Sequence, residues 1–503
     1  MSDTSAIVIG GGIAGLTTAA LLASENIPVT LFEAHYQLGG CAGTFHRGPF
    51  VFDAGATQVA GLENGGIHNR LFNHLKLPQI QAEILDPACV VDLLDGSPPI
   101  HLWHDPEKWK NERKNQFPNS EGFWDICEAL HKSNWSLVAR DPVVPSRSFW
   151  DYFQLLKSLR LGTLSSAIFT TFTISDLLRL TNCHQDKRLR DFLDLQLRLF
   201  SQEPSDRTSA LYGATVLKIF QAPLGLWHLQ GSMQKLSDSL AYSLQKNGGK
   251  LFLNHRVVKI IPGNSERSWK VILINKKGKL ITKTCRDIIC SLPPQSLFNL
   301  IPYEAQLKHK YFSNLNNLPK PTGALVFYGA IQRELLSKDF ANHIQIKSKS
   351  LGSIFLSISK DGDGRAPIGQ ATIIASAFTE TSSWININDD LYNKQKENIF
   401  YEITEIINSY LGLKLNSWIH KELATPKSFL KWTSRPNGIV GGLGQHPYTS
   451  GLFGLPSRTP LQGLWLCGDS IHPGEGTAGV SQSALMVCRQ VMASRGQHMN
   501  LVR

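Results

Sequence analysis

The feature that most constrains this chain is a glycine-rich turn near its N-terminus. An apolar run over residues 6–10 leads into Gly10, Gly12 and Gly15, and residues 16–24 then have the composition of a helix. In such a strand–turn–helix, the first glycine makes the tight turn and the second lets the backbone approach a pyrophosphate, while the third packs helix against strand. The helix N-terminus offers free N–H groups and a partial positive charge to the phosphates. The sequence therefore predicts a dinucleotide-binding unit.

An acidic residue completes this unit. A second apolar strand is expected over residues 29–33, and it ends in Glu33, 18 residues after Gly15. A carboxylate at this place accepts hydrogen bonds from ribose hydroxyls. Its negative charge also repels a 2′-phosphate. Strand, turn, helix, second strand and acid together give the glycine motif the context that it needs.

Further glycine-rich segments favour a long, flat cofactor such as FAD over NAD. Segments 38–44 and 50–56 follow the first unit, and a strand near the C-terminus ends in Asp469. Asp469 is expected to hydrogen-bond the ribityl chain or the phosphate side. Small residues over 473–480 then lead into an apolar helix, which we expect to begin near Gly479. Its dipole would point at the N1/C2=O edge of a flavin and stabilise the reduced ring.

The order of these motifs resembles the amine oxidase/phytoene desaturase superfamily of FAD proteins. Within that superfamily, segments 53–68, 86–89, 230–234 and 468–477 are similar to cyanobacterial carotenoid 3′,4′-desaturases, in the branch of carotenoid desaturases and isomerases. The resemblance runs over about residues 6–492. It implies an FAD-dependent oxidoreductase.

Two cysteines refine this resemblance. Cys41 stands where an arginine often follows the Gly-Gly pair of amine oxidases, which removes an expected charge contact to the pyrophosphate and favours the carotenoid branch. Some family members tether the flavin to a cysteine near the C-terminal motif. Cys467 lies in an apolar strand and is interpreted as a packing residue, so we expect FAD to bind non-covalently.

The expected fold class is α/β, with a Rossmann-like FAD-binding domain built from discontinuous segments and an inserted α+β substrate-binding domain of mixed sheet plus helices. The first domain is assigned to residues 1–90, 226–300 and 440–503, and the second to 91–225 and 301–439. The residues expected to contact FAD are Gly10, Gly12, Ile13, Ala14, Gly15, Glu33, Ala34, Gly39, Gly40, Cys41, Ala42, Gly55, Ala56, Thr57, Val257, Gly468, Asp469, Gly479 and Val480.

Composition restricts the partners. The chain has 503 residues and a formal net charge of +11, which favours an anionic partner. No basic run or finger signature of nucleic-acid type is present, so an acidic membrane surface is the expected partner and nucleic acid is not. The N-terminus leaves no room for a signal peptide, and no apolar run is long enough to span a bilayer. We therefore expect a peripheral protein on the cytoplasmic side of membranes.

The middle of the chain leaves more open. Residues 149–180 have an aromatic, basic-flanked pattern that fits either membrane-facing helices or helices packed on the core. Residues 323–331, 351–359 and 370–378 predict strands, with the turn at 361–364 too short for a calcium loop. No metal-ligand spacing appears. His472, beside the C-terminal motif, is open to a structural or a functional role.

The resemblance implies a carotenoid substrate and hydride transfer to flavin N5, forming a 3′,4′ double bond in a monocyclic, hydroxylated carotene of myxol type. The sequence nominates no catalytic acid or base. It leaves the electron acceptor open between a quinone and oxygen. A carotenoid cis–trans isomerase or polyene saturase would share the fold. A non-catalytic prenyl or lipid carrier on the same fold predicts a decayed glycine fingerprint, whereas this one is intact.

Overall fold

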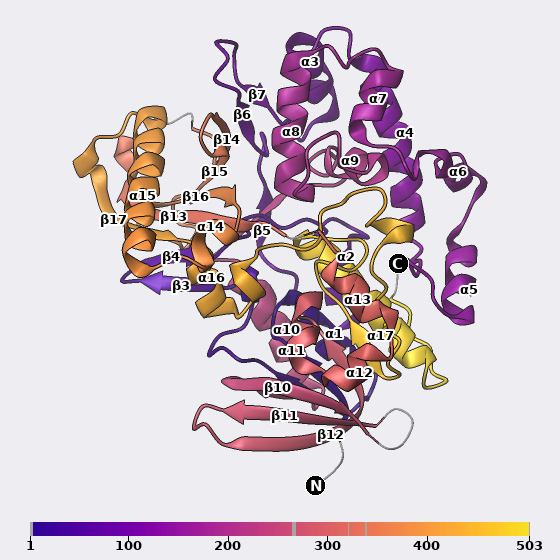
Figure 1. The fold of residues 1–503 in the computed structure, drawn as a ribbon. Coiled ribbons are helices and arrows are strands. Elements are labelled where there is room, and N and C mark those ends of the chain that lie inside the picture. Colours follow the sequence, from indigo (N-terminus) through magenta and orange to yellow (C-terminus); the bar gives the residue numbers. More distant parts are fainter. Residues whose placement is uncertain (1–3, 264–267, 320, 338–339, 502–503) are drawn as a thin grey trace.

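A computed structural model describes residues 4–263, 268–319, 321–337 and 340–501. Two seven-stranded sheets organise the chain, and a helical region lies beside the second sheet (Figure 1). The first sheet has the order β10-β11-β12-β1-β2-β9, with β18 also paired to β12. Its strands are β1 (Thr4–Ile9), β2 (Val29–Phe32), β9 (Lys250–Phe252), β10 (His255–Pro262), β11 (Trp269–Asn275), β12 (Leu280–Cys290) and β18 (Leu464–Leu466).

Strands β18, β12, β1, β2 and β9 run parallel, whereas β10, β11 and the first half of β12 form an antiparallel extension. Alternate residues of β1 face opposite layers. Ala6 and Val8 join the core beneath the three helices α1 (Ile13–Ser24), α10 (Gln234–Lys246) and α17 (Gly476–Ala493). Ile7 and Ile9 join a second core on the other face. The central parallel strands β1 and β2 and the end of β12 are buried on both faces, as is typical of parallel sheets.

The second sheet has the order β17-β13-β16-β15-β14-β6-β7 and is antiparallel except for the β14–β6 pair. Its strands are β6 (Val90–Asp92), β7 (Ile100–His101), β13 (Gly323–Gln332), β14 (His343–Ser348), β15 (Gly352–Ile358), β16 (Gln370–Thr379) and β17 (Trp418–Ala424). The long helix α15 (Asp389–Leu411) covers one face, where Ile403, Ile407 and Leu411 pack on the strands. The face of the second sheet that α15 covers therefore has an apolar core of its own.

The helical region has a separate aromatic core around Trp109, Phe123 and Phe192. Its elements are α3 (Pro106–Gln116), α4 (Glu121–Val138), α5 (Phe149–Ser158), α6 (Leu161–Leu164), η2 (Ala167–Phe169), α7 (Ile174–Leu180), α8 (Lys187–Ser201) and α9 (Ala210–Val216). Helices α5 and α6 stand out at the edge of the molecule (Figure 1).

Short elements connect these bodies. The hairpin β3 (Thr44–Arg47) with β4 (Phe50–Asp53) is one two-stranded sheet, and β5 (Ala82–Ile84) pairs antiparallel with the distant β8 (Trp227–Leu229) in another. The remaining helices are α2 (Ile67–His74), α11 (Leu297–Leu300), α12 (Tyr303–Leu307), α13 (Lys310–Asn316), α14 (Ser382–Ile385), α16 (Pro426–Thr433), η1 (Gly40–Ala42), η3 (Pro294–Ser296), η4 (Arg333–Leu335), η5 (Leu415–Ser417), η6 (Pro436–Gly438) and η7 (Gly451–Phe453).

This architecture confirms the predicted fold class, and it corrects several bounds. Helix α17 begins at Gly476, about one turn before the expected start near Gly479. The proposed domain boundary at residue 90 falls at the start of β6, a strand of the second sheet. The division into two domains remains a prediction.

Candidate functional site: a glycine-lined cleft

The first glycine turn is shaped by close backbone contacts. Gly10 has φ of +100°, and a Cβ added at Gly15 would lie 2.0 Å from the carbonyl oxygen of Gly10. Only glycine fits these two places. By contrast, a Cβ added at Gly12 would meet no atom of the described chain within 4 Å. Gly12 is the N-cap of α1, so Ile13 and Ala14 form the first turn of the helix beside this open space. Backbone N–H groups of that turn can donate hydrogen bonds to an anion bound there.

The second glycine segment lies against the first. The N–H of Gly39 donates to the carbonyl oxygen of Gly11 at 2.9 Å, and a bridge pairs Gly12 with Gly39. Gly39 has φ of +109°, and a Cβ there would lie 2.7 Å from the Cα of Gly43. Gly40, Cys41 and Ala42 follow as the single turn η1. The open space at Gly12 is therefore bordered by backbone from two segments, and we refer to this space and its borders as the cleft.

Glu33 marks one end of this cleft. Its carboxylate accepts hydrogen bonds from the N–H of Gly11 at 2.6 Å and of His35 at 2.7 Å. The His255 N–H donates to the carbonyl oxygen of Glu33 at 2.8 Å, which brings β10 and its residue Val257 to this end. Ala34 follows directly and is half-buried. The predicted ribose contact and the predicted Val257 contact thus lie at the same edge.

The segment after β4 closes over η1. The Ala54 N–H donates to the carbonyl oxygen of Gly43 at 2.8 Å, and a Cβ on Gly55 would lie 2.9 Å from the carbonyl oxygen of Cys41. Ala56 packs on the core of the first sheet and Thr57 is buried. This segment supports the cleft through its backbone.

The C-terminal motif faces the same place. Gly468 has φ of +120°, and its N–H donates to Ser483 Oγ at 2.8 Å; that hydroxyl also donates to the carbonyl oxygen of Val480 at 3.0 Å. A Cβ on Gly479 would lie 2.5 Å from the carbonyl oxygen of Gly474, so Gly479 allows the first turn of α17 to approach its own entry loop. Asp469 forms an ion pair with Arg435 at 2.8 Å.

Burial keeps several groups around the cleft uncharged at neutral pH. It lowers the pKa of His68 and of His472 to about 4, and it raises the pKa of the Cys467 thiol to about 12. Burial and the charge of Asp469 raise the pKa of Glu475 to about 8. The protonated Glu475 carboxyl accepts the Gly442 N–H at 3.0 Å and also bonds Gln202.

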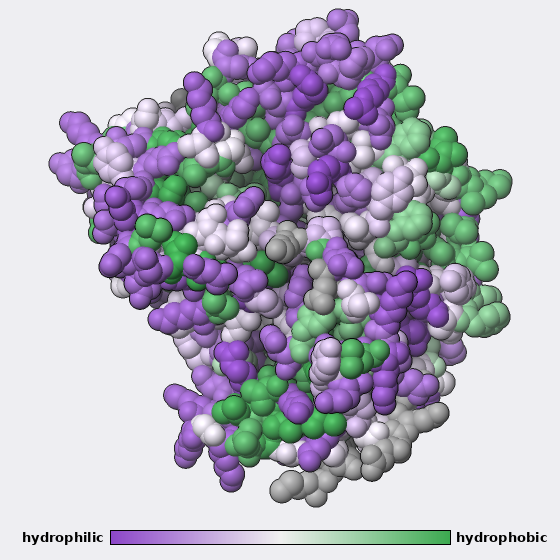
Figure 2. Space-filling view, in the orientation of Figure 1, coloured by the Kyte–Doolittle hydropathy of each residue, from purple (hydrophilic) through white to green (hydrophobic). Residues whose placement is uncertain are grey.

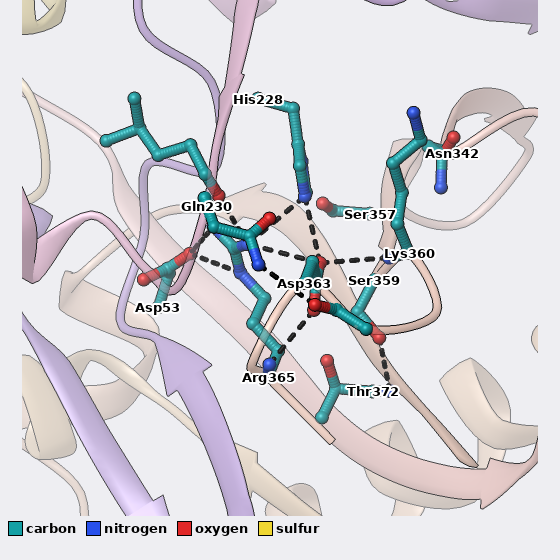
Figure 3. A network of polar contacts seen from close by, with 12 residues as sticks. Asp53, His228, Gln230, Asn342, Ser357, Ser359, Lys360, Asp363, Arg365 and Thr372 are labelled. Atoms are coloured by element: carbon teal, nitrogen blue, oxygen red, sulfur yellow. Dashed lines mark hydrogen bonds and ion pairs between the residues drawn. The ribbon is translucent and has the colours of Figure 1, made fainter. Parts of the chain in front are cut away.

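A buried polar network joins the cleft to the second sheet (Figure 3). The Arg365 guanidinium bonds Asp53 at 3.1 Å and Asp363 at 3.2 Å, and Asp363 also contacts His228 Nε2 at 2.9 Å. The other oxygen of Asp53 accepts the Met233 N–H at 2.9 Å. All four charged or ring side chains are at most 3% exposed. The network links the turn after β15 to two other segments. One is the end of β4, which carries Asp53, and the other is the start of α10, where Met233 is the N-cap.

The donors and the empty space fit FAD. An open glycine cradle at a helix N-terminus, a carboxylate at the end of β2 and a second strand–turn–helix at β18–α17 are the parts that an adenine dinucleotide and its flavin require. Within the described residues, no group of three or more His, Cys, Asp or Glu side chains is placed to hold a metal ion. The fold and cleft define a dinucleotide-binding flavoprotein.

Comparison with known proteins identifies the family. The chain belongs to the flavin containing amine oxidoreductase family, whose profile matches residues 13–492. It is an FAD-dependent oxidoreductase. It is 26% identical to prolycopene isomerase 2 of an Oncidium hybrid cultivar, over 98% of this chain and 84% of that protein. It is 20% identical to a 4,4′-diapophytoene desaturase of Methylomonas, over 95% and 93% of the two chains. A putrescine oxidase structure superposes with a TM-score of 0.64 at 16% identity, over 98% and 99% of the chains.

The structure brings most of the predicted cofactor residues to one cleft, although their contacts with FAD remain predictions. Thr57 and Ala56 lie behind the cleft rather than in the glycine turn. Sequence reasoning missed Ser291, whose hydroxyl donates to the carbonyl oxygens of Ile9 and Gly10 at 3.1 Å. It also gave no role to Arg435. The missing charge at Cys41 was the signal that could have found it.

Proposed function

We propose that this FAD-dependent oxidoreductase desaturates a carotenoid, introducing a 3′,4′ double bond into a monocyclic, hydroxylated carotene. The observation that carries the proposal is the similarity, over nearly the whole chain, to enzymes named for carotenoid substrates.

The residues of the chain would divide the work. Gly12 and the N-terminus of α1 would hold the pyrophosphate, Glu33 the adenosine ribose, and Asp469 the ribityl or phosphate side. When bound, FAD supplies an acceptor for the hydride of an allylic C–H bond, and loss of a proton from the neighbouring carbon to solvent would complete the double bond. The protein would orient the polyene and exclude water, with no strong acid or base required. The reoxidant, a quinone or oxygen, would restore the oxidised cofactor.

A second candidate, carotenoid cis–trans isomerisation, is supported by a specific observation. Four chloroplastic prolycopene isomerases match this chain at 26% identity over 98% of its length. Isomerisation and desaturation differ in the mass of the product and not in the fold that performs them. The cleft is compatible with both.

We also propose that α5 and α6 dock the protein on an acidic membrane surface. The helices and their flanking turns expose large apolar side chains, which form an apolar edge in Figure 2. This docking surface comprises Phe149 (91% exposed), Tyr152, Phe153, Leu156, Leu161 (88% exposed), Leu164 and Ile168. The alternative of core packing holds for Trp150, which packs inward beneath Arg489. Lys157 and Arg160 lie among the exposed side chains and supply charge for anionic headgroups.

No helix within the described part of the chain is both long and apolar enough to span a bilayer. Attachment through α5 and α6 would therefore be peripheral.

The experiment is expression of the chain in bacteria that accumulate hydroxylated monocyclic carotenes, followed by mass spectrometry of the pigments. Desaturation predicts a product lighter by two hydrogens. A product of equal mass with a shifted absorption spectrum would establish isomerisation instead, and a heavier one would establish saturation. A Gly12→Val variant controls for host enzymes. Unchanged pigments with a fully FAD-loaded protein would refute a carotenoid substrate of this class.

A further inference from the structure

The pyrophosphate end of the cleft lacks a positive charge from the local sequence. Cys41 follows Gly39 and Gly40, and burial raises the pKa of its thiol, so it contributes no charge of either sign at neutral pH. The nearby Glu33 and Asp469 are both acidic. Backbone N–H groups at α1 offer only partial charge. Two phosphates brought to this end therefore need a cation from elsewhere in the chain.

The structure brings one from a distant loop. Arg435 follows α16 and its guanidinium lies beside Cys41, Asp469 and Glu475. Its Nε donates to the carbonyl oxygen of Ile439 at 3.0 Å, and its Nη2 donates to the carbonyl oxygen of Gly441 and to Asp469. The Arg435 side chain is 14% exposed, so it is largely buried but still reaches accessible space. These bonds fix the guanidinium in one orientation.

One face of this guanidinium is unused. Among the described residues, Nη1 has no hydrogen-bond partner, and it is not one of the enclosed nitrogen atoms. Two N–H groups of Arg435 are therefore left to donate to a ligand. Asp469 is paired with Arg435, and Glu475 is protonated at neutral pH because its pKa is raised to about 8. The guanidinium therefore faces one negative charge, that of Asp469, and not two.

The loop that carries Arg435 is built to hold this position. Asn437, Gly438 and Gly441 all have positive φ. A Cβ on Gly441 would lie 1.9 Å from Gln202 Nε2, and one on Gly442 would lie 2.2 Å from the carbonyl oxygen of Asp469. The loop therefore presses closely against the C-terminal motif, which brings Arg435 to the cleft.

From this geometry we propose that Arg435 supplies the positive charge that the FAD pyrophosphate requires, in place of an arginine at position 41. The positive charge comes from a loop that is distant in the sequence, residues 435–442, and not from a residue of the second glycine segment. Because the same loop pairs with the start of β13 through Gly323 and Ile439, this contact also links cofactor binding to the second sheet.

The experiment measures flavin retention by the holoprotein. Purified protein is dialysed against mixtures of FAD and riboflavin, which lacks phosphate, and the bound flavins are identified by chromatography. Arg435→Met should lower the ratio of bound FAD to bound riboflavin by about 100-fold, because it removes a charge-assisted contact to phosphate. Arg435→Lys, which keeps the charge, should stay within about tenfold of the native ratio.

The decisive variant is Arg435→Met combined with Cys41→Arg. It restores a cation at the sequence position that the cleft lacks, and we expect it to recover at least tenfold of the lost FAD preference. If Arg435→Met does not fold, Arg435→Gln, which removes the charge but keeps hydrogen-bonding groups, replaces it in both measurements.

Two results would overturn the proposal. Equal losses of FAD and riboflavin in the Arg435 variants would assign Arg435 to positioning Asp469 alone. Failure of Cys41→Arg to recover any FAD preference, in a protein that folds and keeps riboflavin, would show that no charge is needed beside η1.

Discussion

The glycine-lined cleft and the buried polar network of Figure 3 differ in what their residues contact, although residues 43–53 link the two regions. In the cleft, a Cβ added at Gly12 would meet no atom of the described chain within 4 Å, so the space beside it is open to a ligand. In the buried network of Figure 3, Asp53, Asp363 and Arg365 face one another and are defined by their mutual charges. The cleft is arranged for a ligand and the network for the fold. Substitutions in the first should therefore affect binding, and substitutions in the second should affect stability.

The largest effect is expected in the network. Arg365→Met would leave the carboxylates of Asp53 and Asp363 buried without their shared cation, at a cost of about 3–5 kcal/mol. Urea denaturation should show this loss. Arg47→Met is the matched control, because the Arg47–Glu422 pair is largely exposed and should be worth less than about 1 kcal/mol. Similar losses in both variants would remove the distinction between the two regions.

The cleft should lose its ligand without losing its fold. Gly12→Val places a side chain where the described chain leaves space, so FAD affinity should fall by about 100-fold or more while the midpoint of urea unfolding of the FAD-free protein changes little. Glu33→Gln should be milder, since an amide still accepts one hydrogen bond from ribose.

Gly15→Ala is the contrasting substitution within the same turn. Its Cβ would lie 2.0 Å from the carbonyl oxygen of Gly10, so both FAD binding and stability should fall. If Gly12→Val destabilises the FAD-free protein as much as Gly15→Ala does, the space at Gly12 is not a ligand site.

A smaller, pH-dependent effect on stability is expected at Glu475, a buried carboxyl group that borders the cleft. Its folded pKa, raised to about 8, exceeds the unfolded value of 4.5, so its neutral form is favoured by folding. Stability from this group is complete below pH 4.5 and is lost as the pH rises to about 8. Glu475→Gln should therefore become the more stable protein over that range, by on the order of a few kcal/mol.

Thermal unfolding from pH 4 to pH 9 measures this difference. It should grow up to about pH 8 and then level off. Glu397→Gln, changed on an exposed face of α15, should show no such trend. A constant difference across the range would mean that Glu475 is ionised in the folded protein.

The smallest effect on stability is expected on the α5–α6 docking surface. Phe149→Ser with Leu161→Ser should change stability by less than about 0.5 kcal/mol, since both side chains are exposed, yet weaken binding to anionic liposomes. Reversing Lys157 and Arg160 to glutamate should remove the salt-sensitive part of that binding, about 1 kcal/mol for each charge. Leu391→Ser, exposed elsewhere on α15, should have no effect. A native chain that ignores liposomes would refute the docking proposal.

The sequence indicated the two glycine-rich motifs because their determinants are local. Gly10 and Gly15 are dictated by turn geometry within one six-residue stretch, and the same short-range logic found the β18–α17 motif. The exact start of α17 was wrong, because the small residues before Gly479 resemble a loop, although the helix already begins after Glu475 at the N-cap position.

The network and the Arg435 contact could not be predicted in this way. Asp53 and Arg365 are separated by 312 residues, and nothing in either neighbourhood indicates the other. The segment around Asp363 was interpreted only as a hairpin turn. Arg435 likewise reaches Asp469 through a loop whose path depends on Gly438 and Gly441, so only folding reveals which charge stands beside Cys41.

The central claim, that this chain oxidises a polyene through its bound flavin, can be tested by following the flavin itself. Holoprotein is mixed with a hydroxylated monocyclic carotene in anionic liposomes, without oxygen or quinone, and the flavin absorption band is recorded. The account predicts bleaching of the oxidised band in proportion to the carotene added, with the carotene losing two hydrogens in mass. A flavin that stays oxidised while the carotene keeps its mass would contradict it.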